Sequence, residues 1–147
     1  MAFFRVLVHV DATPDRVWKL LEDWEGSAAW MVDATTVRVV SEQRSGVGTS
    51  IEAVTKIAGL PITDVMDVVA WEEPRVIAVQ HKGWPIRGLA WFEIRPDPTG
   101  GSWFEWAEEL DPPLGPLGEL GGALLKPAIE RVLRKSARKL KELAETP

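Results

Sequence analysis

Apolar and polar residues alternate over the first segment of the chain, from residue 3 to residue 11. Phe4, Val6, Val8 and Val10 share one side of this segment, and its charged residues lie on the other. An alternation of period two is typical of a β-strand with one buried face. We therefore expect the chain to begin with a half-buried strand.

A helix signal follows directly. In Thr13-Pro14-Asp15, threonine can cap the first turn, proline suits the first helical position, and aspartate complements the positive end of the helix dipole. Apolar residues then recur at helical spacing as far as Leu21. Gly26-Ser27 interrupts this pattern, and we expect a second short helical turn over residues 28–32.

The middle of the chain consists of short apolar segments separated by turns rich in glycine and proline. Such a pattern predicts hairpins that join into one antiparallel meander. The expected strands cover residues 35–40, 51–57, 62–71, 76–81, 89–95 and 103–110.

A long amphipathic helix is predicted at the C-terminus. Residues 111–122 are rich in proline and glycine and form a poor helix in isolation, whereas the pattern is clean from Pro127 onward. Pro127 should kink the helix near its first full turn. One apolar stripe is expected to face the sheet, formed by Leu125, Ile129, Val132, Ser136, Leu140 and Leu143.

The composition indicates one globular domain over residues 1–147. Hydrophobic residues make up 46% of the chain and charged residues 27%, and there is no cysteine. The lack of cysteine excludes a disulfide scaffold, a thiolate metal site and a cysteine nucleophile. Neither a signal-peptide core nor a stretch of about 20 apolar residues for a membrane span is found. We expect a cytoplasmic protein.

The net charge of −5 is distributed unevenly. Residues 126–141 contain seven basic residues and one acid, so this segment carries +6 and the rest of the chain −11. One interpretation is an anionic partner, such as nucleic acid or a membrane surface. The other is a solvated helix face whose cations are favoured by the helix dipole. We expect the second, without nucleic acid, since the rest of the chain would repel phosphate.

Several short motifs recur in an order that is fairly specific as a set, although each is weak alone. They are residues 10–18 (Val-Asp-Ala-Thr-Pro-Asp-Arg-Val-Trp), Asp23-Trp24 with Trp30, Gly46-Val47-Gly48-Thr49, Glu73-Pro74-Arg75, Gly100-Gly101-Ser102 and the long final helix. With these marks the chain resembles the SRPBCC, or START-like, superfamily, and within it the polyketide cyclase/dehydrase-like group. The resemblance covers nearly the whole chain.

The resemblance implies an α+β helix-grip fold, in which a curved antiparallel sheet wraps around the C-terminal helix and two short helices close one end. Proteins of this kind bind hydrophobic small molecules between sheet and helix. Some fold and dehydrate polyketide chains there, others carry or sense lipids and metabolites, and some act as co-chaperone modules. The fold alone does not settle the activity.

Strand alternation predicts which side chains face this cavity. On the last strand the more apolar face includes Glu108, and on the strand over residues 76–81 it includes His81. Over residues 62–71 two faces compete, and we slightly favour the one with Asp64 over the one with Asp67. The expected ligand-binding residues are Trp30, Asp64, Met66, Trp84, Phe92, Phe104, Trp106, Leu125 and Ile129.

His81 and Glu108 are the candidate catalytic residues. A carboxylate in an apolar cavity has a raised pKa, so it can serve as an acid or base near neutral pH, and histidine needs little adjustment for that role. The alternative is that each lies near a strand end and reaches water or a backbone N–H. The two histidines are distant in the sequence and there is no cysteine, so no metal site is expected. No cofactor is expected either.

Tryptophan is unusually abundant, with eight residues against four phenylalanines and no tyrosine. Trp30 and Trp84 adjoin irregular segments and are expected either at the cavity rim or in plain packing. Trp71, Trp91 and Trp103 are expected on the outer face of the sheet. Three large apolar groups there predict a possible homodimer.

Three functions therefore remain open. A polyketide cyclase or aromatase would hold an aromatic or polycyclic molecule while one acid/base group moves protons. A carrier, sensor or sequestering protein would use the same pocket without chemistry. An interaction module would bind no small ligand and would use the outer tryptophans or the basic helix. The mouth of a cavity is expected between the Trp30 segment, residues 83–85 and residues 111–122.

Overall fold

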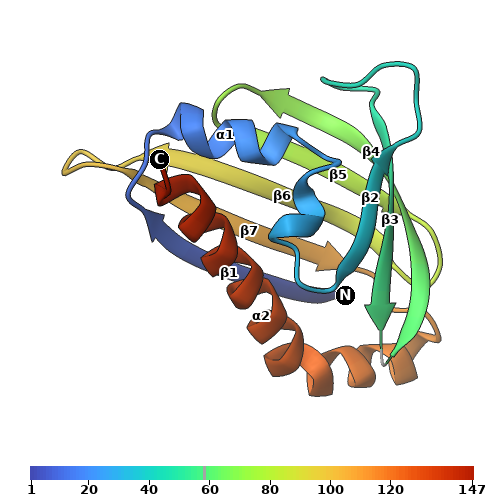
Figure 1. Cartoon of the computed structure of the whole chain (residues 1–147). Coiled ribbons are helices and arrows are strands. Elements are labelled where there is room, and N and C mark those ends of the chain that lie inside the picture. Colours follow the sequence, from blue (N-terminus) through green and yellow to red (C-terminus); the bar gives the residue numbers. More distant parts are fainter. Residues whose placement is uncertain (58) are drawn as a thin grey trace.

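A curved antiparallel sheet and one long helix enclose the interior of the protein (Figure 1). The computed structural model describes residues 1–57 and 59–147. Its elements in chain order are β1 (Ala2–Val10), α1 (Pro14–Glu22), the 3-10 turn η1 (Ser27–Ala29), β2 (Ala34–Val39), β3 (Ser50–Ile57), β4 (Leu60–Glu72), β5 (Val76–Lys82), β6 (Arg87–Pro96), β7 (Ser102–Leu110) and α2 (Gly115–Glu145).

The seven strands follow the order β1-β7-β6-β5-β4-β3-β2, and every neighbouring pair is antiparallel. Helix α2 crosses one face of this sheet, and α1 and η1 lie on the same face (Figure 1). The buried apolar residues of strands and helices form the core between them. This arrangement confirms the predicted helix-grip fold.

The first helix begins where the sequence predicts. The Thr13 hydroxyl accepts a hydrogen bond from the backbone N–H of Arg16, and Pro14 occupies the first turn. Val17, Trp18 and Leu21 form its buried side. In place of the second predicted helix there is the single 3-10 turn η1, so the expectation of two short helices is only partly met. Gly26 precedes this turn, and Trp30 ends it.

Helix α2 begins earlier than expected, at Gly115, and continues through Pro127. Pro116 lies in the first turn, where its missing N–H has no helical partner to lose. Gly118 fits because a Cβ there would lie 1.7 Å from the carbonyl oxygen of Pro113. The helix axis changes direction where the colour passes from red to orange in Figure 1, near Pro127. A proline inside a helix is an ordinary cause of such a kink.

The buried stripe of α2 differs from the predicted one at both ends. Leu125 and Leu143 are exposed, and the buried residues are Leu133, Ser136, Ala137, Leu140 and Ala144. Small alanine side chains allow the helix to approach β1 closely, and α2 packs more extensively on β1 than on the other strands. The hydroxyl of Ser136 accepts a hydrogen bond from the backbone N–H of Val32, in the segment after η1. Ser136 and Leu140 belong to both stripes, whereas the predicted one lacks Leu133, Ala137 and Ala144.

Trp71 also faces the opposite way from the prediction. A bulge in β4 between Val68 and Ala70 shifts the register, so Trp71 pairs with Ile77 on the inner face. There it packs edge-on against Trp18, with ring centroids 5.1 Å apart. Because one extra residue reverses the alternation of side chains, residues beyond the bulge change faces. Trp91 and Trp103 remain on the outer face.

Within the described part of the chain, no helix has the length and the apolar character that crossing a bilayer requires.

Candidate functional site

A cavity of about 240 Å³ lies between the sheet and α2. Its wall is mostly apolar and is formed by the inner faces of β2 to β7, the segment after η1, and the middle of α2. Five polar side chains lie among these apolar groups, and the exposed Lys56 adds a sixth at the edge. The five are Asp33, Thr55, Asp64, His81 and Glu108.

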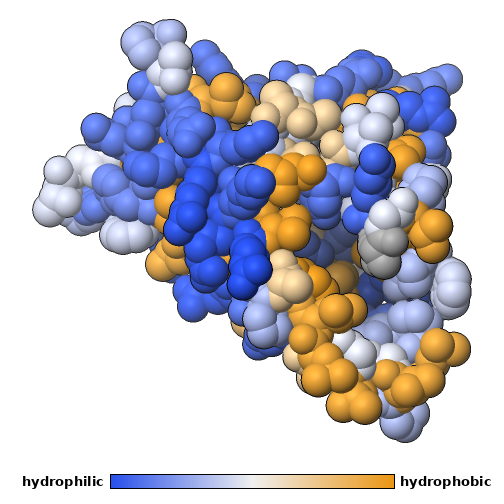
Figure 2. All heavy atoms as spheres, turned by 60° about the horizontal axis from the view of Figure 1, so that its bottom comes forward, coloured by the Kyte–Doolittle hydropathy of each residue, from blue (hydrophilic) through white to orange (hydrophobic). Residues whose placement is uncertain are grey.

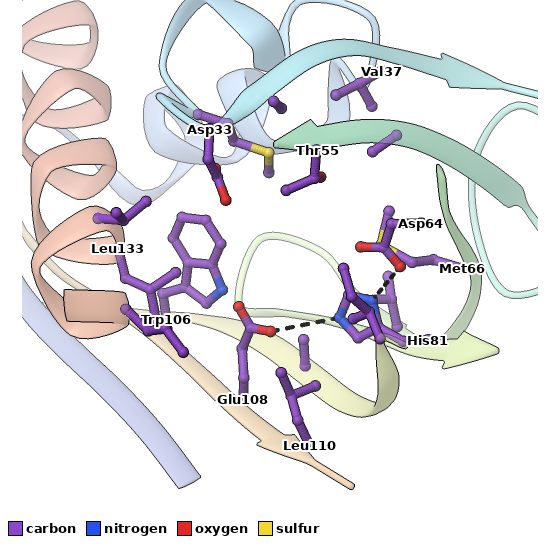
Figure 3. A pocket seen from close by; sticks show the side chains of 18 of the residues that line it. Asp33, Val37, Thr55, Asp64, Met66, His81, Trp106, Glu108, Leu110 and Leu133 are labelled. Atoms are coloured by element: carbon purple, nitrogen blue, oxygen red, sulfur yellow. Dashed lines mark hydrogen bonds and ion pairs between the residues drawn. The ribbon is translucent and has the colours of Figure 1, made fainter. Parts of the chain in front are cut away.

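Three of these polar residues form a linear array (Figure 3). The His81 Nδ1 atom lies 2.8 Å from Oδ1 of Asp64, and its Nε2 atom lies 3.6 Å from Oε2 of Glu108. The exposed fractions of the side chains are 7% for His81, 8% for Asp64 and 12% for Glu108. An imidazole is therefore held between two carboxyl groups and almost removed from water.

Small residues on β6 allow this array to form. His81 lies on β5 and Glu108 on β7, so β6 runs between them. Gly88 pairs with His81, and Ala90 pairs with Glu108. Neither carries a side chain large enough to separate the imidazole from the carboxyl group. Gly88 has φ +137°, and a Cβ there would lie 2.1 Å from the carbonyl oxygen of Glu109.

Burial governs the acidity of Glu108. Removal from water raises the pKa of its carboxyl group to about 7, because the charged form loses its hydration. The carboxyl groups of Asp64 and Asp33 act in the same direction, whereas the positive charge of His81 opposes the rise. A carboxyl group with this pKa is divided between acid and base at neutral pH, as proton transfer requires.

The environment of His81 acts on the pKa of its imidazole in two opposite directions. Burial alone lowers the pKa of the imidazole, but the hydrogen bond and the charge of Asp64, together with the charge of Glu108, outweigh it. The pKa of His81 is therefore raised above its ordinary value. Since Asp64 engages Nδ1, the other ring nitrogen, Nε2, faces Glu108. That buried nitrogen has no hydrogen-bond partner in the structure.

Asp33 is a polar residue of the cavity that the sequence reasoning missed. It directly precedes β2, and its side chain points into the cavity from the side opposite Glu108 (Figure 3). Burial raises the pKa of its carboxyl group, and the charge of Asp64 adds to that effect. Its position just after the expected helical turn carries no strand alternation, so no pattern in the sequence indicated which way it points.

An aromatic cluster supports one wall of the cavity. Phe92 and Trp106 line the space, with ring centroids 5.2 Å apart. Trp30 lies behind them, 1% exposed, and contacts both rings edge-on at 5.9 and 5.7 Å. Edge-to-face contacts at these distances stabilise the wall and fix the ring planes.

The predicted site residues separate into two groups. Those that line the cavity are Asp64, Met66, His81, Phe92, Trp106, Glu108 and Ile129. Trp30 and Phe104 are fully buried in the core behind the wall, and Trp84 and Leu125 are exposed by 74% and 56%. The connection between β5 and β6 turns Trp84 outward, beside Pro112, Pro113 and Leu114.

Comparison with known proteins gives the same architecture. The family model described as "Polyketide cyclase / dehydrase and lipid transport" matches residues 1–145. No curated protein matches the chain significantly.

Three solved structures illustrate the similarity. The protein TTHA0849 from Thermus thermophilus is 17% identical, with 97% of this chain and 96% of that chain covered and a TM-score of 0.82. The Zhui aromatase/cyclase from Streptomyces sp. R1128 is 16% identical, with coverage of 97% and 93% and a TM-score of 0.82. A START superfamily protein from Mycobacterium smegmatis is 15% identical, with coverage of 99% and 98% and a TM-score of 0.79. At these identities the likeness concerns the fold, and it is the match over residues 1–145 that shows that the chain belongs to the polyketide cyclase/dehydrase and lipid transport family.

Proposed function

We propose that the protein binds a flat, uncharged aromatic or polycyclic molecule in its cavity and moves protons on it, as a polyketide cyclase or aromatase would. The observation that carries this proposal is the Asp64–His81–Glu108 array in a mostly apolar cavity. Buried polar groups cost stability unless they are paired, and His81 Nε2 has no hydrogen-bond partner. A ligand oxygen beside this nitrogen would satisfy it.

The size of the cavity limits the ligand. An apolar cavity of about 150 Å³ holds one benzene ring. A cavity of about 240 Å³ therefore accommodates roughly two fused rings. A longer molecule would extend out of the cavity, for example past the exposed Lys56. Phe92 and Trp106 offer flat faces against which such rings can stack.

The charge of the cavity favours a neutral ligand over an anion. Asp33, Asp64 and Glu108 all border the space, and His81 supplies the compensating charge. Two like charges about 5 Å apart repel by about 3 kcal/mol at an effective dielectric constant near 20. Lys56 is exposed, so solvent screens its attraction for a carboxylate. We expect ketones and phenols to bind at least tenfold more tightly than carboxylates of the same shape.

The array can carry out the proton transfers of an intramolecular aldol reaction. Glu108 as carboxylate would take a proton from a carbon beside a ketone, while the His81 imidazolium donates a hydrogen bond to the ketone oxygen. The enolate carbon would then attack a second carbonyl of the same molecule, and the new alkoxide would receive the proton that Glu108 took in the first step. Loss of water, with proton transfer through the same groups, would leave a double bond. Asp64 holds the imidazole in the required orientation.

Hydrogen exchange of β-tetralone in D₂O tests this proposal without knowledge of the natural substrate. This bicyclic ketone fits the cavity and exchanges the protons beside its carbonyl when a base removes them. We expect the wild-type protein to accelerate the exchange, as followed by NMR, and Glu108→Gln to abolish the acceleration while β-tetralone still binds. Binding without acceleration in the wild type would contradict the catalytic part of the proposal. If neither β-tetralone nor β-naphthol bound, the proposed class of ligand would be contradicted.

A non-catalytic carrier is the second candidate, and the small share of polar groups in the cavity wall favours it. In a carrier, the array would only satisfy the polar end of a ligand. Changes at His81 or Glu108 would then leave transport unchanged, whereas enlargement of Ala90 in the apolar wall would abolish binding.

Homodimerisation stays a prediction of the sequence. With Trp71 on the inner face, it now rests on Trp91 and Trp103, which pack against Phe3 and His9 on the outer face. Sedimentation at high micromolar concentration checks it, and a monomer would remove it.

A further inference from the structure

The first half of α2 exposes an uncommon number of large apolar side chains. Five leucines, here called the leucine patch, are each more than half exposed. They are Leu114, Leu117, Leu120, Leu124 and Leu125, with exposed fractions of 71%, 67%, 57%, 72% and 56%. Trp84, 74% exposed, lies beside Leu114. Contiguous apolar surface of this kind is rare on a protein that contacts only water.

The second half of the same helix exposes positive charge. Six exposed basic residues follow the leucine patch and are here called the basic stripe. They are Lys126, Arg131, Arg134, Lys135, Arg138 and Lys139. In Figure 2 the hydrophobic surface over the first half of α2 adjoins the hydrophilic surface over its second half on one face of the molecule. A single flat surface can therefore contact both.

We propose that this face of α2 docks the protein on an anionic lipid bilayer. Leucine and tryptophan side chains at a membrane surface enter the boundary between headgroups and acyl chains, while neighbouring lysines and arginines contact anionic headgroups. The leucine patch and the basic stripe supply both kinds of contact. Outside residues 126–141 the chain carries a net charge of −11, so an anionic bilayer would attract the segment with the basic stripe and repel much of the remaining surface.

Two other binding partners, a second copy of the chain and a nucleic acid, fit this surface less well. A second copy of the chain across a two-fold axis would bring two basic stripes into proximity, and like charges repel. A nucleic acid would meet the basic stripe but would leave the leucines unburied. A lipid surface is the partner whose chemistry matches both halves of the helix.

Docking would also bring the cavity close to the bilayer. Ile129 and Val132 lie between the leucine patch and the C-terminal part of the basic stripe, and both line the cavity. A hydrophobic molecule dissolved in the bilayer could then enter the cavity without crossing water. This consequence rests on the proposed ligand binding, whereas docking itself does not.

Vesicle flotation tests the docking. The probes are vesicles of phosphatidylcholine alone and vesicles with about one part phosphatidylglycerol to two parts phosphatidylcholine. We expect flotation with the anionic vesicles at low salt, at least tenfold weaker partitioning into neutral vesicles, and a loss of binding as salt is raised. Each basic residue near an anionic surface strengthens binding about fivefold, so Arg131→Gln/Arg134→Gln/Arg138→Gln should weaken it at least tenfold.

Matched variants separate the surface from general effects. Leu117→Ser/Leu120→Ser/Leu124→Ser should weaken flotation at least tenfold, and its fold is checked by circular dichroism. Val40→Ser/Val47→Ser/Val69→Ser changes three exposed apolar residues elsewhere and should bind like the wild type.

Arg38→Gln/Arg44→Gln/Arg75→Gln removes the same charge from other exposed positions and is the control for the basic stripe. It should retain most of the binding.

A second measurement uses the unchanged chain. Bromine atoms on the upper acyl chains of the lipids quench tryptophans that approach them, and Trp84 is the exposed tryptophan beside the leucine patch. We expect quenching in the wild type that is largely lost in Trp84→Phe. Absence of flotation with anionic vesicles, or flotation unaffected by both α2 variants, would overturn the proposal. The proposal would also be overturned if the protein formed a concentration-dependent dimer that Leu117→Ser/Leu120→Ser/Leu124→Ser abolished, while the same variant left vesicle binding unchanged.

Discussion

The two ends of the space between the sheet and α2 carry different side chains on the same strands. At the end beneath α1, β5 presents Ile77 and β7 presents Phe104, both with at most 1% of their surface exposed. Toward the other end, β5 presents His81 and β7 presents Glu108, and the space between them is hollow. A few residues along each strand thus separate a filled apolar core from a cavity with charged groups.

This contrast separates what stabilises the fold from what the cavity can do. The packed end buries large side chains, each of which contributes about 1.5–3 kcal/mol. The hollow end buries ionisable groups that cost stability, because their charged forms lose hydration. A protein selected only for stability would fill this space with apolar side chains, so the hollow end is where a binding function is expected.

The largest expected effect concerns two buried leucines on α2. Leu140 is fully buried at the packed end, whereas Leu133 borders the cavity. Leu140→Ala should lower the free energy of unfolding by about 3–5 kcal/mol, since it creates a closed void. Leu133→Ala only enlarges a space that is already open and should cost about 2 kcal/mol, at the low end of the range for such a change. Urea denaturation measures both, and equal losses would contradict the contrast between the two ends.

The next effect is the pH dependence of stability. The pKa of Glu108 is raised from 4.5 to about 7 in the folded protein, so the folded state binds more protons than the unfolded state between these values. The contribution of Glu108 to stability is therefore fully present below pH 4.5. It is lost as the pH rises through about 7, and this loss lowers the free energy of unfolding by roughly 3 kcal/mol. The raised pKa of His81 acts with the same sign.

Glu108→Gln should remove most of this decline and raise the free energy of unfolding above pH 7. The matched control is Glu109→Gln, one residue further along β7 on the outer face, which should keep the wild-type slope. Urea denaturation at a series of pH values gives the comparison. A slope that persists in Glu108→Gln would show that its carboxyl group is not buried as described.

The smallest effect is a loss of ligand binding without a loss of stability. Ala90 lies between His81 and Glu108 on the floor of the cavity, and Ala90→Leu would fill part of the space. We expect the affinity for β-tetralone to fall at least tenfold, or about 1.4 kcal/mol, with stability within about 1 kcal/mol of the wild type. Val69→Leu, on the exposed outer side of β4, is the control. Unchanged affinity in Ala90→Leu would exclude binding in this cavity.

Strand alternation predicted the inner face of β5 and β7 well, because neither strand contains a register shift. It therefore put His81 and Glu108 on the cavity side, where the structure has them. The same reasoning failed for Trp71, since the bulge in β4 leaves no clear mark in the sequence. Asp64 precedes that bulge and was placed on the inner face only by a slight preference.

Helical periodicity was less informative than strand alternation. It identified α2, and Pro127 indicated a kink, but it chose a stripe that included Leu125, because the period alone does not show which residues face the sheet on either side of the kink. The small residues Gly88 and Ala90, which allow His81 to reach Glu108, were visible at alternate positions of one strand and could have been noticed. The position of Asp33 depends on loop geometry, which no local pattern describes.

A structure of the protein with β-tetralone bound would test the central claim most directly. We expect the rings to pack against the cavity wall formed by Phe92 and Trp106, and the ketone oxygen to lie within hydrogen-bonding distance of His81 Nε2, with the exchangeable carbon facing Glu108. A ligand outside the cavity, or one whose ketone oxygen points away from His81, would contradict it.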